Sequence, residues 1–299
     1  MSSWPLPSAK LSRGTRYLQP YLDHLARHQY PVVVNQQIVL SWKYKIIKWA
    51  HPLKLVFSSL NKNKINYVVA KGIGAALQAY PTPFSRPFTD IDLYVDHADF
   101  AQSIKTLISL GYSLKDLAHY QPPFIHRTLS KPDWPPVELH FALSRDFPLQ
   151  NNFFNDFINS SYLHEFEGVK FPLPQPDYHA FYLLHHARNH FLCNSPIWLL
   201  DYSLLLRKFP ELDQKMTELN RIYHYGRGLQ AALQLCRCFF PPVDQKTKTP
   251  KLSPLENIIF RSSKIYYESK QSPRLYSLLT RAFLSLRKDS VFNSFLTRV

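Results

Sequence analysis

The sequence RPFTDIDLYV, residues 86–95, places Asp90 and Asp92 in a run that otherwise resembles a buried β-strand. Side chains two positions apart in a strand share a face, so both carboxylates are expected to point together while Ile91 points into the core. Two such charges repel strongly unless a cation lies between them, and Mg²⁺ prefers one or two carboxylates together with substrate phosphates. The structural alternative is that Asp90 caps a turn and Asp92 pairs with Arg86.

A third carboxylate occurs in the sequence VELHF, residues 137–141. In a strand, Glu138 and His140 lie on one face and the apolar residues beside them on the other. If this strand lies beside residues 91–95, three acids converge at the surface of a sheet. Such a cluster is typical of metal-assisted phosphoryl transfer, in which two acids hold the metal and the third binds a metal or deprotonates the attacking hydroxyl. Otherwise Glu138 is an edge-strand acid that faces water.

Lys71 and Gly72 lie where a predicted strand ends and a predicted helix begins. A glycine at this point lets a phosphate approach backbone N–H groups at the helix N-terminus, and Lys71 would add a positive charge. Arg86 is expected to pair with a triphosphate or with Asp92. His140 is expected either to contact substrate or to be a hydrogen-bonded structural residue.

The order of predicted elements indicates an α+β fold with a mixed sheet, flanked by N- and C-terminal helical regions. Pro52 is expected to end the first long helix, so that a short second helix follows it. Predicted strands cover residues 65–69, 91–95, 124–130 and 137–143, and predicted helices cover residues 36–49, 72–80, 97–111, 176–192, 197–209 and 227–239.

The chain is expected to divide into four regions. They are an N-terminal helical region at 1–60, an α+β core at 61–175, a helical domain at 176–240, and a linker with a basic helical tail at 241–299. The core would carry the metal site, and the helices before and after it would form a wall of the adjoining cleft.

Charge is concentrated at the two ends of the 299-residue chain. Residues 1–64 carry +9, residues 245–299 carry +8 and the middle carries −2, within a net charge of +15. Positive flanks of this kind predict an anionic macromolecular partner such as RNA. Solvated helical faces or a contact with anionic lipid are the alternatives.

The composition, 45% hydrophobic and 15% aromatic, is typical of a folded globular protein. No apolar run approaches the roughly 20 residues that span a bilayer, and the start lacks the apolar segment of a signal peptide. Cys193, Cys236 and Cys238 have neither zinc-ligand nor redox spacing. We therefore expect a cytoplasmic protein with reduced cysteines.

His186 and His190 are four residues apart on a predicted helix, which is a spacing found in metal ligands. The intervening residues include no glutamate of the kind that zinc proteases carry there. We interpret the two histidines as contacts between domains or with substrate.

These motifs resemble those of the DNA polymerase β-like nucleotidyltransferase superfamily, which has a glycine-containing strand-to-helix turn, an Asp-x-Asp motif and a third acid on a later strand. More closely, about residues 45–210 resemble a bacterial family of uncharacterised nucleotidyltransferases. The chain is also similar to abortive-infection toxin nucleotidyltransferases, which share the "KG" and "DID" motifs. The matching residues are Lys71-Gly72, Tyr80-Pro81, Arg86, Asp90-Ile91-Asp92-Leu93-Tyr94-Val95, Gly111-Tyr112 and Val137-Glu138-Leu139-His140.

The resemblance implies an enzyme that uses Mg²⁺, or alternatively Mn²⁺, to transfer a nucleoside monophosphate from an NTP to a hydroxyl acceptor such as RNA or protein, releasing pyrophosphate. Asp90 and Asp92 would bind the metal, with Glu138 as the third acid. The superfamily usually has Gly-Gly or Gly-Ser at the turn. This chain has Gly72-Ile73-Gly74, so phosphate binding would use the backbone, Lys71, or Gly74 as the second glycine.

Two alternatives keep the same fold. One is a toxin-like enzyme that modifies tRNA, which the basic flanks would suit. The other is a catalytically inactive member of the fold that binds nucleotide or RNA.

Overall fold

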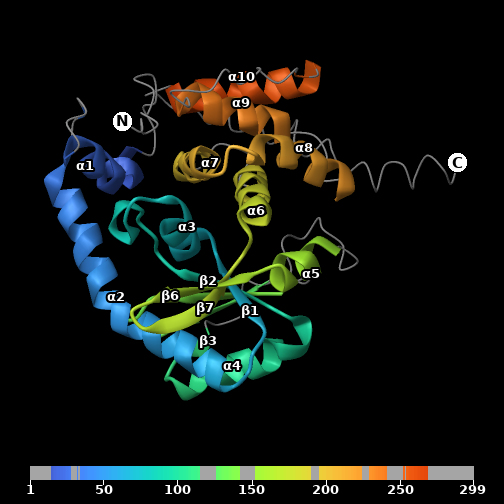
Figure 1. Cartoon of the computed structure of the whole chain (residues 1–299). Coiled ribbons are helices and arrows are strands. Elements are labelled where there is room, and N and C mark those ends of the chain that lie inside the picture. The colour runs from blue at the N-terminus through green and yellow to red at the C-terminus, as the bar shows by residue number, and fades with distance from the viewer. Residues whose placement is uncertain are drawn as a thin grey trace, which may run out of the picture. The chain divides into compact units, whose positions relative to one another are not determined.

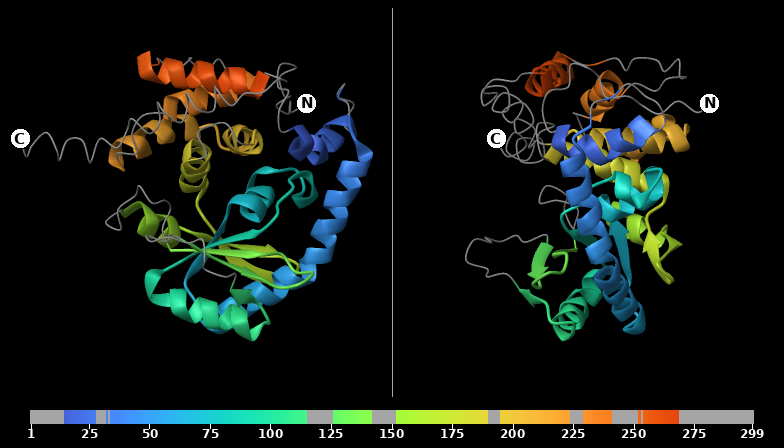
Figure 2. Two further views of the ribbon diagram at one scale, coloured as in Figure 1. Left: turned by 180° about the vertical axis from the view of Figure 1, so that it is seen from behind. Right: turned by 90° about the vertical axis from the view of Figure 1, so that its left-hand side faces the viewer.

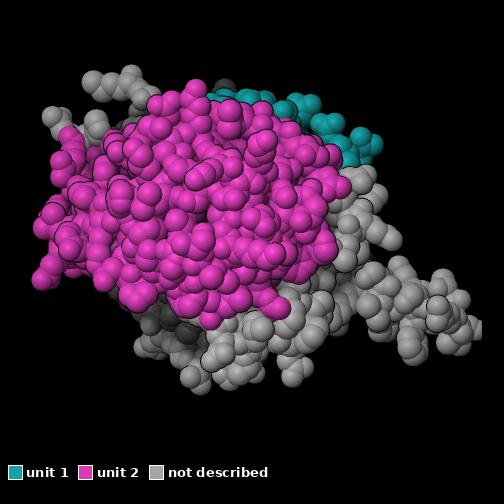
Figure 3. Space-filling model, turned by 90° about the horizontal axis from the view of Figure 1, so that it is seen from below, with its two compact units in different colours: residues 1–17, 183–299 teal, residues 18–182 magenta. Residues whose placement is uncertain are grey.

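The computed structural model describes residues 15–27, 32, 34–114, 126–141, 152–189, 195–223, 229–240, 252 and 254–268. The chain divides into two compact units, one of residues 18–182 and one of residues 1–17 and 183–299 (Figure 3). Cys236 and Cys238, the described cysteines, form no disulfide, and Cys193 lies outside the described residues. Within the described ranges, no helix is long and apolar enough to cross a membrane.

The unit of residues 18–182 is built on a five-stranded sheet with the strand order β1-β2-β5-β4-β3. Figure 1 labels β1, β2 and β3 of this sheet. The pair β2–β5 is parallel and the other three pairs are antiparallel. The predicted α+β fold with a mixed sheet is therefore confirmed. The strands are β1 (Tyr67–Ala70), β2 (Ile91–Val95), β3 (Ser113–Leu114), β4 (His126–Ser130) and β5 (Val137–His140).

One face of this sheet forms the hydrophobic core. Val69, Leu93 and Leu139 alternate with residues of the opposite face on three adjacent strands, and all three are fully buried. They pack with Phe57 of α2 (Gln36–Lys62) and Leu107 of α4 (Phe100–Ser109). Burying each such side chain contributes about 1.5–3 kcal/mol relative to exposing it, so this face fixes the strand register.

α2 continues through Pro52, and the prediction that this proline ends the helix is wrong. A proline inside a helix usually costs about 3 kcal/mol, because it removes an N–H donor and clashes with the preceding turn. Here Trp49 lies buried before the proline, and Leu53, Val56 and Phe57 lie buried after it. Because the same apolar face packs on the core on both sides of Pro52, its burial outweighs the local penalty.

A hairpin of β6 (Tyr162–Phe166) and β7 (Val169–Leu173) adds a second layer to the core. Its turn residues, Glu167 and Gly168, have φ values of 52° and 75°, as a two-residue hairpin turn requires. The sequence analysis predicted no strand here, although a glycine between two alternating apolar runs is a hairpin signal.

Helices also lie on the other side of the sheet. α3 (Lys71–Ala79) lies on the opposite side from α4 (Figure 2). Phe157 of α5 (Asn152–Asn159) and Tyr182 of α6 (Pro176–Asn189) both contact Tyr94 of β2 on this face. The described residues also form three short 3₁₀ helices: η1 (Thr15–Leu18), η2 (Pro83–Ser85) and η3 (His97–Asp99).

The unit of residues 1–17 and 183–299 is helical in its described part. It contains the end of α6 and four further helices: α7 (Ile197–Lys208), α8 (Leu212–Ile222), α9 (Leu229–Phe239) and α10 (Pro254–Glu268). Asp213 of α8 forms an ion pair with Arg237 of α9. α8 was not predicted, although its buried Leu212, Met216 and Leu219 have helical spacing. Residues 241–251 of the predicted linker and 269–299 of the predicted tail lie outside the described residues.

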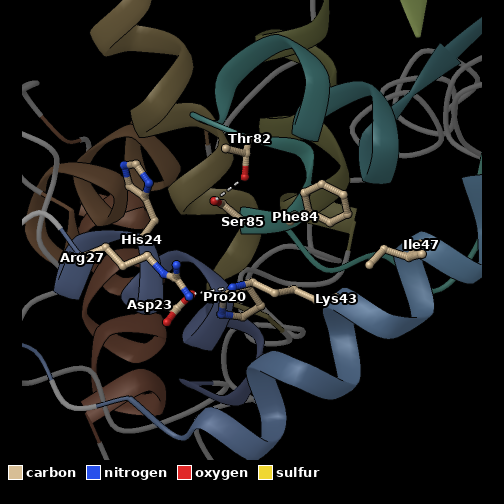
Figure 4. Close-up of a pocket in the computed structure, with 9 residues that line it drawn as sticks. All are labelled: Pro20, Asp23, His24, Arg27, Lys43, Ile47, Thr82, Phe84 and Ser85. Atoms are coloured by element: carbon tan, nitrogen blue, oxygen red, sulfur yellow. Dashed lines mark hydrogen bonds and ion pairs between the residues drawn. The ribbon is translucent and has the colours of Figure 1, made fainter. Parts of the chain in front are cut away.

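A pocket of about 340 Å³ lies between α1 (Gln19–Arg27), α2 and η2 (Figure 4). On its wall the buried carboxylate of Asp23 accepts hydrogen bonds from Arg27 at 3.0 Å and Lys43 at 2.7 Å. Burial alone would raise the pKa of Asp23, but these donors lower it below its ordinary value. The network therefore ties α1 to α2.

We expect Leu53→Ala to lower the free energy of unfolding by about 2–5 kcal/mol, because Leu53 is fully buried directly after Pro52. The matched control is Leu40→Ala on the same helix, since Leu40 is 63% exposed, and it should change stability by less than about 0.5 kcal/mol. Urea denaturation measures both. Equal effects of the two substitutions would show that core packing does not hold α2 in place.

We expect Asp23→Asn to lower the free energy of unfolding at pH 7 by about 1–3 kcal/mol, because Lys43 and Arg27 lose a charged acceptor. The folded-state pKa of Asp23 lies below the ordinary 3.8. Its stabilisation is therefore present above that pH and is lost as the pH falls through the folded-state pKa.

Urea denaturation between pH 3 and pH 7 should show wild type and Asp23→Asn converging in stability as the pH falls below 3.8. Glu165→Gln, on an exposed position of β6, is the control and should leave stability unchanged throughout. A constant difference between wild type and Asp23→Asn across this range would contradict the ion-pair interpretation.

Candidate active site

Asp92, Glu138 and His140 each place one potential metal-ligand atom within 4.8 Å of the other two. Asp92 of β2 and Glu138 of β5 are direct partners in the parallel pair, so the predicted adjacency of these strands is confirmed. His140 lies two residues beyond Glu138 on the same face. Its Nε2 lies 3.1 Å from a carboxylate oxygen of Asp92 and 3.5 Å from one of Glu138.

A buried lysine partly balances these acids. Nζ of Lys71 forms an ion pair with Asp92 and lies 3.9 Å from a carboxylate oxygen of Glu138. Burial alone would lower the pKa of this ammonium, but the charges of Asp92 and, less strongly, Glu138 raise it above its ordinary value. Lys71 is therefore a permanent cation beside the two carboxylates.

The two remaining acids differ in their protonation. Burial would raise the pKa of Glu138, but the hydrogen bond to His140 and the charge of Lys71 hold it below the ordinary range. Asp90 precedes β2 and is not one of the three clustered donors. Burial, followed by the charges of Asp92 and Glu138, raises the pKa of Asp90 to about 7. The charges of Lys71, Asp90, Asp92 and Glu138 therefore influence one another's protonation.

Two further cations act on Asp90. Arg86 is buried, donates from Nη1 to the carbonyl oxygen of Pro87 at 3.0 Å, and opposes the rise in the pKa of Asp90. Lys45 of α2 lies with its ammonium 4.3 Å from the ring centre of Trp49, and the charge of Asp90 acts on it. The sequence did not single out Lys45, because nothing distinguishes it from the other lysines of this helix.

Aromatic side chains cover the cluster on one side. Tyr94 stacks on His140 with ring centres 4.6 Å apart and planes at 9°, and its hydroxyl hydrogen-bonds to that of Tyr182. Phe157 contacts the ring of Tyr94 edge-on at 5.4 Å. These contacts fix the imidazole of His140 next to Asp92. In the sequence, the sign that Tyr94 and Asp92 share a face is the two-residue period of a β-strand.

The two glycines of the turn allow close packing. A Cβ on Gly74 would lie 2.7 Å from the carbonyl oxygen of Val69, and a Cβ on Gly72 would lie 2.9 Å from Cβ of Phe88. Both distances are shorter than real Cβ contacts, so any side chain would push α3 away from β1 or from the segment before β2. The glycines therefore set the depth at which Lys71 enters the cluster, and their predicted role in phosphate binding remains a proposal.

The predicted histidine pair has a different environment. His190 lies outside the described residues, and His186 packs edge-on against Trp198 with ring centres 4.5 Å apart. Over the described parts of the chain, the cluster of Asp92, Glu138 and His140 is the one group of three potential metal ligands. None of these three residues lines the pocket beside Asp23.

Solved structures with some similarity to this chain include several nucleotidyltransferases. ANT(2")-Ia in complex with adenylyl-2"-tobramycin has a TM-score of 0.43 and 10% identity, covering 58% of this chain and 98% of that chain. The lincomycin-bound lincosamide antibiotic adenylyltransferase LnuA has a TM-score of 0.35 and 19% identity, covering 49% and 89%. An antigenic nucleotidyltransferase-like protein from Paracoccidioides brasiliensis has a TM-score of 0.37 and 16% identity, covering 58% and 87%. All three TM-scores are below 0.5.

The family comparison covers most of the chain. Among curated proteins, none matches this sequence. The family described as "Uncharacterised nucleotidyltransferase" matches residues 12–241, which include every residue of the acid cluster and the turn before it. The chain therefore belongs to this family and is a nucleotidyltransferase.

Proposed function

We propose that the protein is a metal-dependent enzyme that transfers a nucleoside monophosphate from an NTP to a hydroxyl acceptor and releases pyrophosphate. The observation that supports this most is the strand register that sets Asp92 beside Glu138, with Lys71 against both carboxylates. Buried acids rarely face each other in a sheet without a cation to offset their repulsion. Membership of a nucleotidyltransferase family supports the same reaction type.

The donor set fits a small divalent cation. Two carboxylates and an imidazole converge within 4.8 Å, and oxygen-rich sites of this kind bind Mg²⁺ or Mn²⁺. Asp92 and Glu138 would hold the ion, with Asp90 beside them. A bound ion would offset negative charge on the triphosphate and on the departing pyrophosphate.

Cations from three elements would bind the triphosphate. Lys71 is already inside the cluster, Arg86 is buried, and the charges of Arg86 and of Lys45 on α2 interact with that of Asp90. The first turn of α3, which begins at Lys71 and contains Gly72, would add backbone N–H donors. These groups would orient the α-phosphate for attack.

Glu138 is the acid best placed to meet the acceptor. Its side chain is 27% exposed, whereas that of Asp92 is 4% exposed. An acceptor hydroxyl that enters from solvent would therefore reach Glu138 first. Its oxygen would attack the α-phosphorus, its proton would pass to Glu138, and the bond between the α-phosphorus and the bridging oxygen would break to release pyrophosphate.

A polyanion such as RNA is the acceptor class that the charge pattern favours. α2 contains five lysines and no aspartate or glutamate, and it supplies Lys45 to the site. Positive charge on one long helix raises the encounter rate with phosphate-rich molecules. The toxin-like activity on tRNA is one case of this proposal.

We expect Asp92→Asn to reduce transfer of label from an α-labelled NTP at least about 100-fold, because the cluster loses its most buried charge. Incubation with Mg²⁺ and cell extract, followed by gel separation, measures this transfer and shows which macromolecule acquires label. Asp133→Asn is the matched control, since Asp133 is exposed and its carboxylate forms an ion pair with Lys48 on the surface. Circular dichroism checks that both variants fold, and full activity of folded Asp92→Asn would contradict the proposal.

If the acceptor is RNA, its affinity should fall steeply with salt, because each phosphate contact releases counterions. Filter binding between 50 and 200 mM salt is expected to show a loss of about tenfold or more. Lys54→Gln and Lys62→Gln on α2 together should reduce the slope. Affinity that does not depend on salt, with label found on a small uncharged acceptor, would exclude the polyanion.

A further inference from the structure

The turn between β1 and α3 has a backbone conformation that few side chains adopt. Lys71 has a φ of +46°, in the left-handed region. Non-glycine residues in this region persist where the surrounding structure holds them, and they concentrate at functional sites. Because the ammonium of the same residue contacts Asp92 and Glu138, the conformation of this turn decides where the cation lies.

His179 of α6 holds the turn. Its ring is fully buried, and its Nε2 lies 3.1 Å from the backbone nitrogen of Lys71. The N–H of Lys71 donates, so Nε2 carries the lone pair and the proton of the neutral ring is on Nδ1. Burial, together with the charge of Arg86, lowers the pKa of His179 to about 3, so the ring is neutral at physiological pH.

Gln78 completes the chain of hydrogen bonds. Nδ1–H of His179 donates to Oε1 of Gln78 at 2.8 Å. The amide nitrogen of Gln78 then donates to the carbonyl oxygen of Pro174 at 2.9 Å and to the hydroxyl of Tyr162 at 3.2 Å. These hydrogen bonds link the β6–β7 hairpin to the backbone of Lys71.

We propose that His179 is a positioning residue for nucleotidyl transfer, which accepts the N–H of Lys71 and so holds the left-handed turn that places the Lys71 ammonium against Asp92 and Glu138. This role rests on the proposed function, because it takes the acid cluster as the reaction centre. The ring nitrogens of any fully buried histidine need hydrogen-bond partners, so the identity of those partners indicates the role. Here both nitrogens are used, and the one that faces Lys71 has to be an acceptor.

Three substitutions distinguish a positioning role of His179 from a merely structural one. His179→Gln keeps one acceptor and one donor, so it can bond both Lys71 and Gln78. His179→Phe keeps a ring of similar size but neither bond. Gln78→Leu removes the second link while leaving the imidazole in place. His185→Phe is the matched control, because His185 is buried on the same helix.

The first measurement is hydrogen exchange of the Lys71 backbone amide in the full chain without ligands. We expect exchange at least about tenfold faster in His179→Phe than in wild type, and protection near the wild-type level in His179→Gln and in His185→Phe. Unchanged protection of Lys71 in His179→Phe would overturn the proposal. This measurement does not use activity, so it decides the question even if the chain transfers no nucleotide.

The second measurement is kcat and KM for the NTP with each variant. Misplacement of a cation by about 1 Å can reduce rates about 100-fold, so we expect kcat/KM to fall about 10- to 100-fold in His179→Phe, with recovery in His179→Gln. In a Lys71→Met background, His179→Phe should reduce nucleotide affinity no further. Equal losses of kcat/KM in His179→Phe and His185→Phe, or additive losses with Lys71→Met, would show a merely structural role. If wild type transfers no nucleotide but the Lys71 amide still loses its protection in His179→Phe, the proposed function is contradicted. The role of His179 in holding the turn is then not contradicted.

Discussion

The repulsion between Asp92 and Glu138, which face each other across the parallel strands β2 and β5, is the constraint on which the site depends. Like charges at this separation destabilise a fold unless cations and hydrogen bonds offset them. Lys71 supplies the cation and His140 the hydrogen-bonding partner. The left-handed turn at Lys71 and the glycines beside it bring α3 close enough for that lysine to reach both carboxylates.

The hydrophobic core and the acid cluster are two faces of one alternating pattern. Leu93 and Leu139 lie in the core, while the residues directly before them, Asp92 and Glu138, lie on the other face. A register shift of one residue in either strand would bury a charge in the core and expose a leucine, so packing energy on one face holds the acids in place on the other.

The sequence predicted the elements whose signals are local. Alternation in residues 91–95 and 137–140 was enough to predict two strands and a shared polar face, because side-chain direction in a strand depends only on its period. At Pro52 the local rule predicts the end of a helix, but tertiary packing keeps α2 continuous. His179 of α6 contacts the backbone of Lys71, and the charge of Lys45 on α2 interacts with that of Asp90; such relations depend on the fold rather than on spacing. The hairpin turn at Glu167-Gly168 has a local signal in the sequence, a glycine between two alternating apolar runs, but no strand was predicted there.

The most direct test of the central claim is the anomalous scattering of Mn²⁺ in crystals grown with a non-hydrolysable NTP. A peak is expected within about 2.0–2.3 Å of carboxylate oxygens of Asp92 and Glu138, together with triphosphate oxygens. The Lys71 ammonium should then lie against the phosphates. A nucleotide that binds with no metal at these carboxylates would contradict the account.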